Sequence, residues 1–273
     1  MIDVQIPLFV GILSLFILWI AYKKRYFTWE APSKQPRIPS FLFFGALLGY
    51  LILYFLIPLV FGSLVHLPTI GYLAWSNFLT QIFLIFLFIL FFFHKWSLMQ
   101  GIFKNSSSSI FFDLFLGMIT WVIAYPFVVF ISSFIEGILL GPFHFEELPD
   151  QIAVEYFKMA LTSPLYGTLA FFSIIFLAPL LEEFMFRGLL QNWLKRWMGR
   201  LYAIGITSIC FALFHFSFIQ GMGNIPIITS LFFLSFFLGF IYERQRSLFA
   251  SISLHATFNF ISLINLLIFK VST

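Results

Sequence analysis

Charged side chains are scarce in this chain of 273 residues. Lys, Arg, Asp and Glu make up 10% of the sequence, whereas 61% of it is hydrophobic and the mean hydropathy is +1.02. So few polar groups cannot cover the surface of a soluble protein of this size. The composition therefore excludes a soluble globular domain. It predicts an all-α, polytopic transmembrane helical bundle, located in the cell membrane as a multi-pass protein.

Cysteine and several catalytic motifs are also nearly or wholly absent. Cys210 is the single cysteine, which excludes an intramolecular disulfide and a thiol cluster for a metal. The sequence has no His-Glu-x-x-His pair, and neither the Gly-x-Ser-x-Gly nor the Gly-x-Gly-Asp segment of other hydrolase types. No basic segment is long enough to indicate a nucleic-acid site, so we expect no nucleic-acid partner.

Apolar segments that can cross a bilayer recur along the whole chain. A crossing helix needs about 18 to 20 residues, and we predict about eight such helices. They run approximately from Ile6 to Tyr22, Phe41 to Leu64, Phe78 to Phe93, Ile110 to Phe134, Leu165 to Leu181 and beyond, Leu201 to Phe218, Ile225 to Tyr242, and Leu248 to Phe269. The stretch from Gln151 to Leu161 is amphipathic, and we expect it to lie along the outer interface or to form a structured loop.

Basic residues gather in alternate loops between these segments. Lys and Arg in short loops collect on the cytoplasmic side, so both termini are predicted to face outward. The predicted cytoplasmic residues are Lys23, Lys24, Arg25, Lys34, Arg37, Lys95, Lys104, Lys195, Arg196, Arg200, Arg244 and Arg246. The predicted outer side carries Lys158, Lys270, Asp3, Glu136, Glu146, Glu147, Asp150 and Glu155.

Two adjacent acids interrupt the fifth apolar segment. An ionised group at bilayer depth costs about 2.5 to 3.5 kcal/mol on insertion scales, so Glu182 and Glu183 need a reason to be there. Pro179 lacks an amide donor, and we expect it to break or restart the helix one turn before them. Neighbours on a helix diverge by about 100°, so the two acids should face different ways. Arg187, four residues after Glu183, can pair with it and leave Glu182 facing a cleft. A wholly structural cluster is the alternative.

Three further polar residues lie on two later segments. His215 belongs to the sixth segment, while His255 and Asn259 are four residues apart on the eighth and should project from one helix face. Counting about 1.5 Å per residue from the nearest cytoplasmic basic residue puts Glu182, His215 and Asn259 about 20 to 22 Å deep, and His255 about 14 Å deep. We therefore predict a polar chamber inside the membrane, formed by three helices.

The chamber contains the groups that peptide hydrolysis requires. A carboxylate and an imidazole beside a water molecule can remove its proton, and donors such as His255 and Asn259 can hold the developing oxyanion. A Zn²⁺ ion bound by Glu and His is the alternative within enzymes, although the spacing argues against it. A non-catalytic immunity or scaffold protein stays open, as does a transporter, for which we see no pair of interrupted segments in corresponding halves.

Three motifs in order carry a family resemblance. They are Glu-Glu-x-x-x-Arg at Glu182, Glu183 and Arg187, Phe-x-x-x-His at Phe211 and His215, and His-x-x-x-Asn at His255 and Asn259. The chain resembles the CAAX protease and bacteriocin-processing family (CPBP or Abi family) of intramembrane glutamate proteases, and is similar to type II CaaX prenyl endopeptidases. The resemblance covers roughly Leu165 to Ser262. It divides the chain into residues 1–164, with membrane spans and an outer loop but no recognised motif, and residues 165–273, a membrane-embedded catalytic core.

The resemblance implies a metal-independent endopeptidase without a cofactor. It implies an all-helical fold of about eight spans whose site opens toward the cytoplasm. The partners it implies are membrane lipid and a peptide or protein substrate, which is a CaaX-like tail, a bacteriocin or a signal peptide; substrate lipidation and oligomeric state are left open. By this resemblance Glu182 and His215 activate water, His255 and Asn259 form the oxyanion site, and Glu183 and Arg187 support the chamber.

Overall fold

The helices of the chain are long and apolar, as the sequence predicts. The computed structural model describes residues 5–28, 36–105, 107–141, 148–149 and 151–269, and within these ranges the regular elements are helical, apart from an isolated bridge between Lys104 and Ser247. The α-helices are α1 Gln5–Lys23, α2 Ser40–Leu64, α3 Thr69–Phe92, α4 Trp96–Phe103, α5 Ile110–Leu140, α6 Ile152–Ala160, α7 Pro164–Phe172, α8 Ala178–Glu183, α9 Asn192–Phe214, α10 Asn224–Gln245 and α11 Leu248–Phe269. The predicted all-α class is confirmed.

Six helical stretches in the described part of the chain are long and apolar enough to cross a membrane. They make this a multi-pass membrane protein, but the predicted number of about eight spans is not confirmed. The fifth and sixth predicted segments fall on one stretch of 51 residues, Pro164–Phe214, which Gly199 interrupts with a φ of 78°. The first predicted segment falls on a shorter apolar helix, Phe9–Lys23.

Two predicted helix boundaries need correction. α3 begins at Thr69, well before the predicted start at Phe78, because Pro68 provides the natural start of a helix and the polar residues that follow it are tolerated inside the bundle. α9 ends at Phe214, whereas the predicted segment continued through His215 to Phe218. Asn224 explains this ending, because its side chain binds both the backbone N–H and the carbonyl of Ser217 and holds the chain in a turn.

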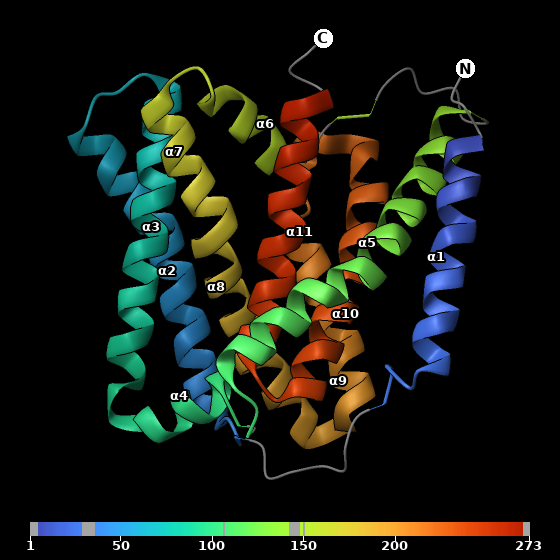
Figure 1. Cartoon of the computed structure of the whole chain (residues 1–273). Helices are drawn as coiled ribbons and strands as arrows, with labels where there is room; N and C mark the ends of the chain where they lie inside the picture. Colours follow the sequence, from blue (N-terminus) through green and yellow to red (C-terminus); the bar gives the residue numbers. More distant parts are fainter. Residues whose placement is uncertain (1–4, 29–35, 106, 142–147, 150, 270–273) are drawn as a thin grey trace.

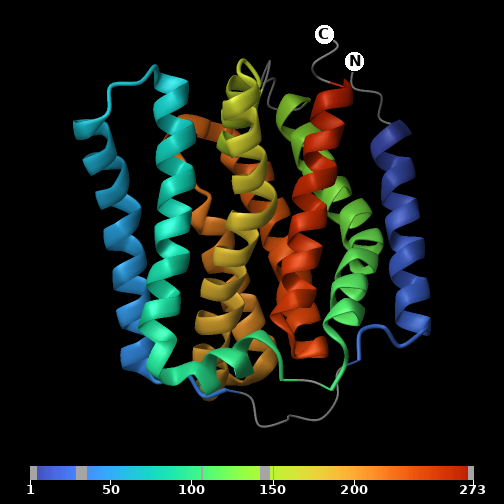
Figure 2. The same ribbon diagram turned by 60° about the vertical axis from the view of Figure 1, so that its left-hand side comes forward.

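The bundle has two sides with the acid-bearing helix between them. α2, α3 and α4 form one side and α1 and α5 the other, and α5 runs obliquely across α10 and α11 (Figures 1 and 2). One apolar core joins α2, α3 and α4 to Leu181 and Phe184, and a second joins α1, α5, α10 and α11. Leu181 and Phe184, the neighbours of Glu182 and Glu183 in the chain, therefore belong to the first core.

The distribution of charge along the bundle agrees with the predicted alternation. The first turn of α1 and the last turn of α11 lie at the same end (Figure 1), and the basic residues after α1, around α4, at the start of α9 and after α10 lie at the other. The side of the membrane that each end faces stays a prediction, as does the interfacial position of α6, which matches the predicted amphipathic stretch. Asp3, Lys34, Glu146, Glu147, Asp150 and Lys270 lie outside the described residues.

Candidate active site

The two acids lie on a helical path that two π segments interrupt. A first π segment, Ser173–Leu177, precedes α8, and a second π segment, Phe184–Gln191, follows it. Pro179 lies in the first turn of α8, which begins at Ala178, so the predicted restart of an α-helix one turn before the acids is confirmed; the chain stays helical through it, so the alternative of a break is wrong. A wider turn accommodates a residue that cannot donate a backbone hydrogen bond. Glu182 therefore lies within a continuous helical path and not at a free helix end.

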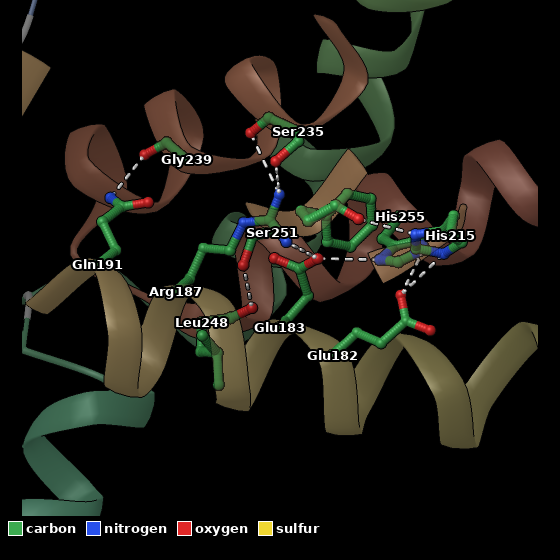
Figure 3. A network of polar contacts seen from close by, with 11 residues as sticks. Glu182, Glu183, Arg187, Gln191, His215, Ser235, Gly239, Leu248, Ser251 and His255 are labelled. Carbon is green, nitrogen blue, oxygen red and sulfur yellow. Dashed lines mark hydrogen bonds and ion pairs between the residues drawn. The ribbon is translucent and has the colours of Figure 1, made fainter. Parts of the chain in front are cut away.

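Glu183 and Arg187 form the ion pair that their spacing predicts. Arg187 Nη1 donates to Glu183 Oε1 at 2.9 Å, and both side chains are 0% exposed. Arg187 Nη2 also donates to Ser235 Oγ at 2.8 Å and to the Ser235 carbonyl at 3.1 Å (Figure 3). The Arg187 guanidinium lies 4.6 Å from the centre of the Phe211 ring. Pairing, hydrogen bonding and ring contact together compensate this charge in an apolar interior.

Glu182 faces the two histidines. Its Oε2 atom lies 3.9 Å from His215 Nε2 and 3.8 Å from His255 Nε2, and Figure 3 shows the three side chains pointing toward one another. Both distances exceed that of a direct hydrogen bond and suit one bridging water molecule. The side chain of Glu182 is 17% exposed and that of His215 is 19% exposed, but the Glu182 Oε2 atom itself is buried and accepts no hydrogen bond within the described residues.

The second nitrogen of each histidine ring fixes its orientation. His215 Nδ1 donates to the Phe211 carbonyl at 2.9 Å, because a carbonyl can only accept. His255 Nδ1 donates at 2.9 Å to Glu183 Oε1, which also accepts from Arg187. In a neutral ring the Nε2 atom is then an acceptor. With both rings neutral, three acceptors converge on one point, which favours a small molecule with two O–H donors, such as water; a second proton on His255 would turn its Nε2 atom into a donor.

The predicted convergence of Glu182, His215 and His255 from separate helices is confirmed. The prediction that the two acids serve separate partners holds only in part, because the His255 ring reaches Glu183 with Nδ1 and approaches Glu182 with Nε2. The neighbouring acids diverge around the helix, but one imidazole is wide enough to meet both of them. His255 therefore connects the ion pair to the Glu182 side chain.

Asn259 does not share a contact point with His255 in this structure. Its Nδ2 atom donates to the backbone carbonyl of Ile174, in the first π segment, at 2.9 Å. An amide nitrogen carries two hydrogens, so one of them is left for another acceptor. A role for Asn259 in the oxyanion site stays a prediction.

Ser235 is a site residue that the sequence does not reveal. It lies in the apolar sequence Leu-Phe-Phe-Leu-Ser-Phe-Phe of α10, where a serine is ordinary in a membrane helix. A buried Arg187 has more donors than one carboxylate can accept, so the sequence indicates that Arg187 needs a further acceptor but does not indicate which residue provides it. In the described residues no group of three His, Cys, Asp or Glu side chains has the geometry to hold a metal ion.

An apolar cavity lies against another face of the same helical path. Its volume is about 370 Å³, and side chains of α3, α4, α8 and the second π segment line it, among them Ile85, Ile89, Met99, Phe103, Leu180 and Leu181. Leu181 directly precedes Glu182 in the chain. A cavity of this size and lining suits an apolar chain.

The comparison with protein families agrees with the resemblance that the motifs carry. Residues 163–261 match the family model described as type II CAAX prenyl endopeptidase Rce1-like. The matched segment contains both acids, Arg187, both histidines and Asn259. No curated protein and no solved structure matches the chain.

Proposed function

We propose that this chain is a metal-independent glutamate endopeptidase of the membrane. The match of residues 163–261 to the model of the type II CAAX prenyl endopeptidase Rce1-like family supports this proposal. The substrate is a membrane-associated peptide, and the reaction is hydrolysis of a peptide bond. The observation that carries the proposal is the convergence of Glu182 Oε2 with the Nε2 atoms of His215 and His255, at 3.9 and 3.8 Å, inside an apolar bundle.

Glu182 is the general base for water in this proposal. The water donates one hydrogen to Glu182 Oε2 and the other to His215 Nε2, which the Phe211 carbonyl holds in the accepting form. As the water oxygen attacks the carbonyl carbon, its proton passes to Glu182. The same proton then moves to the leaving nitrogen, the C–N bond breaks, and a carboxylic acid and an amine are released; the acid gives its remaining proton to water and becomes a carboxylate.

His255 and Asn259 are the donors for the oxyanion. Because His255 Nδ1 already donates to Glu183, donation from Nε2 requires an imidazolium ring. Its positive charge and that of Arg187 then balance the charges of the two carboxylates. Asn259 contributes the amide hydrogen that the Ile174 carbonyl does not bind. Each such donor typically contributes about 10² to 10³ in rate.

The apolar cavity beside Leu181 supports a substrate with a hydrocarbon tail. A prenyl chain attached near the scissile bond would gain favourable burial in a cavity of about 370 Å³. A peptide with a prenylated cysteine three residues from its end should therefore have a lower KM than the same peptide without the lipid. Equal KM values for the two peptides would remove the lipid from the proposal but leave the hydrolysis.

The test of hydrolysis is purified protein in lipid vesicles with the prenylated peptide, analysed by mass spectrometry. Glu182→Gln keeps the size of the side chain and removes the base, so kcat should fall by about 10² to 10⁴. Glu155→Gln in α6 is the matched control, because this carboxylate is 52% exposed and lies outside the site. A Glu182→Gln protein with wild-type turnover would exclude Glu182 as the base.

A second measurement needs no assumed substrate. Peptide termini in membranes and medium are compared between cells that make the wild type and cells that make Glu182→Gln at matched abundance. Termini found only with the wild type would support proteolysis and identify candidate substrates. Indistinguishable termini would argue for an immunity, scaffold or transport role instead.

A further inference from the structure

The first π segment leaves one backbone carbonyl without a partner in its own helix. The amide of Ala178 donates to the Ser173 carbonyl, five residues back. In an α-helix that amide would have bonded the Ile174 carbonyl. In π geometry the Ile174 carbonyl would accept from residue 179, which is Pro179 and has no N–H. Neither geometry therefore supplies a backbone donor to Ile174.

Asn259 supplies that donor from a distant part of the chain. Its Nδ2 atom lies 2.9 Å from the Ile174 oxygen, and α11 carries it. Ile174 and Asn259 are both partly buried in a bundle that lies in lipid, where an unpaired carbonyl is costly. The bond therefore stabilises the wide turn that Pro179 requires.

The second π segment shows the same arrangement on the other side of the acids. The amide of Asn192 donates to the Leu189 carbonyl, three residues back, and therefore not to the Gly188 carbonyl of α geometry or the Arg187 carbonyl of π geometry. The side chain of Asn192 donates to both, at 3.2 and 2.9 Å. An asparagine thus covers the released carbonyls of each π segment, and α8 lies between the two.

The first π turn decides where Glu182 points. One residue inserted into a helical turn rotates all later side chains by about 100° relative to an unbroken α-helix. Without that turn, Glu182 would face away from His215 and His255. α11 therefore holds the acid-bearing helix at two places, with His255 on Glu183 and Asn259 on Ile174.

We propose that Asn259 is a positioning residue that holds the first π segment through the Ile174 carbonyl and so directs Glu182 to the two histidines. This role rests on the proposed function, because Glu182 is the group that is directed. It is separate from the oxyanion role, since it uses the other hydrogen of the Asn259 amide.

A double-mutant cycle separates the two roles. Pro179→Ala restores an N–H at residue 179, which can reach the Ile174 carbonyl and replace Asn259 there. Asn259→Leu should lower kcat with little change in KM in the wild-type background, by about 10² to 10³. In the Pro179→Ala background the loss should be smaller by at least about tenfold, equivalent to one hydrogen bond. The same fold-loss in both backgrounds would overturn the positioning role.

A spectroscopic measurement tests the bond without any turnover. Isoleucine labelled with ¹³C at the carbonyl and with ¹⁵N gives a one-bond carbonyl–nitrogen signal only at Ile-Ile pairs, and the chain has two, Ile174–Ile175 and Ile227–Ile228. Asn259→Leu should move the Ile174 carbonyl signal upfield, as expected when a hydrogen bond is lost, and leave the Ile227 signal in place. Adding Pro179→Ala should move it back toward the wild-type position.

Asn265→Leu is the matched control for both measurements. Asn265 also lies on α11 and is partly buried, but its Nδ2 atom donates to the Tyr125 hydroxyl at 2.6 Å. This variant should leave the Ile174 signal unchanged. An Ile174 signal that Asn259→Leu does not move would overturn the proposal, even if Glu182 proves to be the base. Conversely, a shifted signal in a protein that cleaves no peptide would leave the Asn259 contact standing and refute the proposed hydrolysis.

Discussion

The Arg187 side chain shows how a single buried charge is accommodated in this bundle. Glu183 accepts from one guanidinium nitrogen, and Ser235 accepts from another with both its hydroxyl and its carbonyl. The Phe211 ring covers the guanidinium and also contacts both histidine rings, at centroid distances of 4.8 and 5.8 Å. The charge that supports the site is therefore held by residues from α9 and α10 as well as from its own helix.

Ser235→Ala should destabilise the protein more than an ordinary serine substitution. It removes a 2.8 Å hydrogen bond to a fully buried guanidinium, and hydrogen bonds to charged groups contribute about 1.5 to 3 kcal/mol. Ser230→Ala on the same helix is the control, because the Ser230 hydroxyl bonds the Ile227 carbonyl of its own helix. Thermal unfolding in detergent should show a lower Tm for Ser235→Ala alone. Equal Tm values for the two variants would contradict this account of Arg187.

Residue spacing predicts local pairs but not contacts between helices. The Glu183–Arg187 pair follows from four-residue spacing, because both partners lie on one helix. The contacts of Asn259 with Ile174 and of Arg187 with Ser235 join helices far apart in the sequence, and no periodicity encodes them. The depth count predicts that Glu182 and the histidines share a layer. It does not predict the ring orientations, which depend on the backbone carbonyl of Phe211 and on Glu183.

The helices themselves were largely predictable, whereas their internal irregularities were not. A continuous apolar run predicts a membrane helix of either α or π geometry. The hydropathy of the sequence therefore does not indicate the two π segments. Pro179 indicated a disturbance, and the structure resolves it as a wide turn and not as a break. The interruption at Gly199 likewise lies within one long apolar stretch, which is why the number of spans is uncertain from composition alone.

The approach of α5 to α11 gives a prediction for the packing of whole helices. A Cβ atom at Gly117 would clash with the Ala250 carbonyl oxygen and with the Ser253 side chain, whose hydroxyl bonds the Leu114 carbonyl. Gly117→Ala should therefore force the helices apart and cost about 1 to 3 kcal/mol. The measurement is the free energy of unfolding in mixed micelles.

Gly137→Ala on the same helix provides the control for this packing. Nothing lies within 4 Å of a Cβ atom at Gly137, so the change should be neutral or stabilise α5 by up to about 1 kcal/mol. If Gly117→Ala were as stable as Gly137→Ala, the close contact between α5 and α11 would not exist in the membrane.

At the scale of the whole molecule, the two ends of the bundle differ in charge. The Lys104–Ser247 bridge and the hydrogen bond from the Asn105 amide to the Arg246 carbonyl join the α4–α5 loop to the α10–α11 loop, so Lys104 and Arg246 lie at one end. The loop between α2 and α3, Val65–Pro68, carries no Lys or Arg and lies at the other end (Figure 1). Basic loops stay in the cytoplasm, so the end with Lys104 should face inward.

Single cysteines at the two ends can test this orientation, because Cys210 is the only native cysteine and can be replaced by alanine. His66→Cys places a thiol in the loop between α2 and α3, and Ser107→Cys places one between α4 and α5; both positions are exposed. A membrane-impermeant maleimide added to intact cells should label His66→Cys and should label Ser107→Cys only after permeabilisation. The reverse pattern would put the basic loops outside and contradict the predicted outward termini.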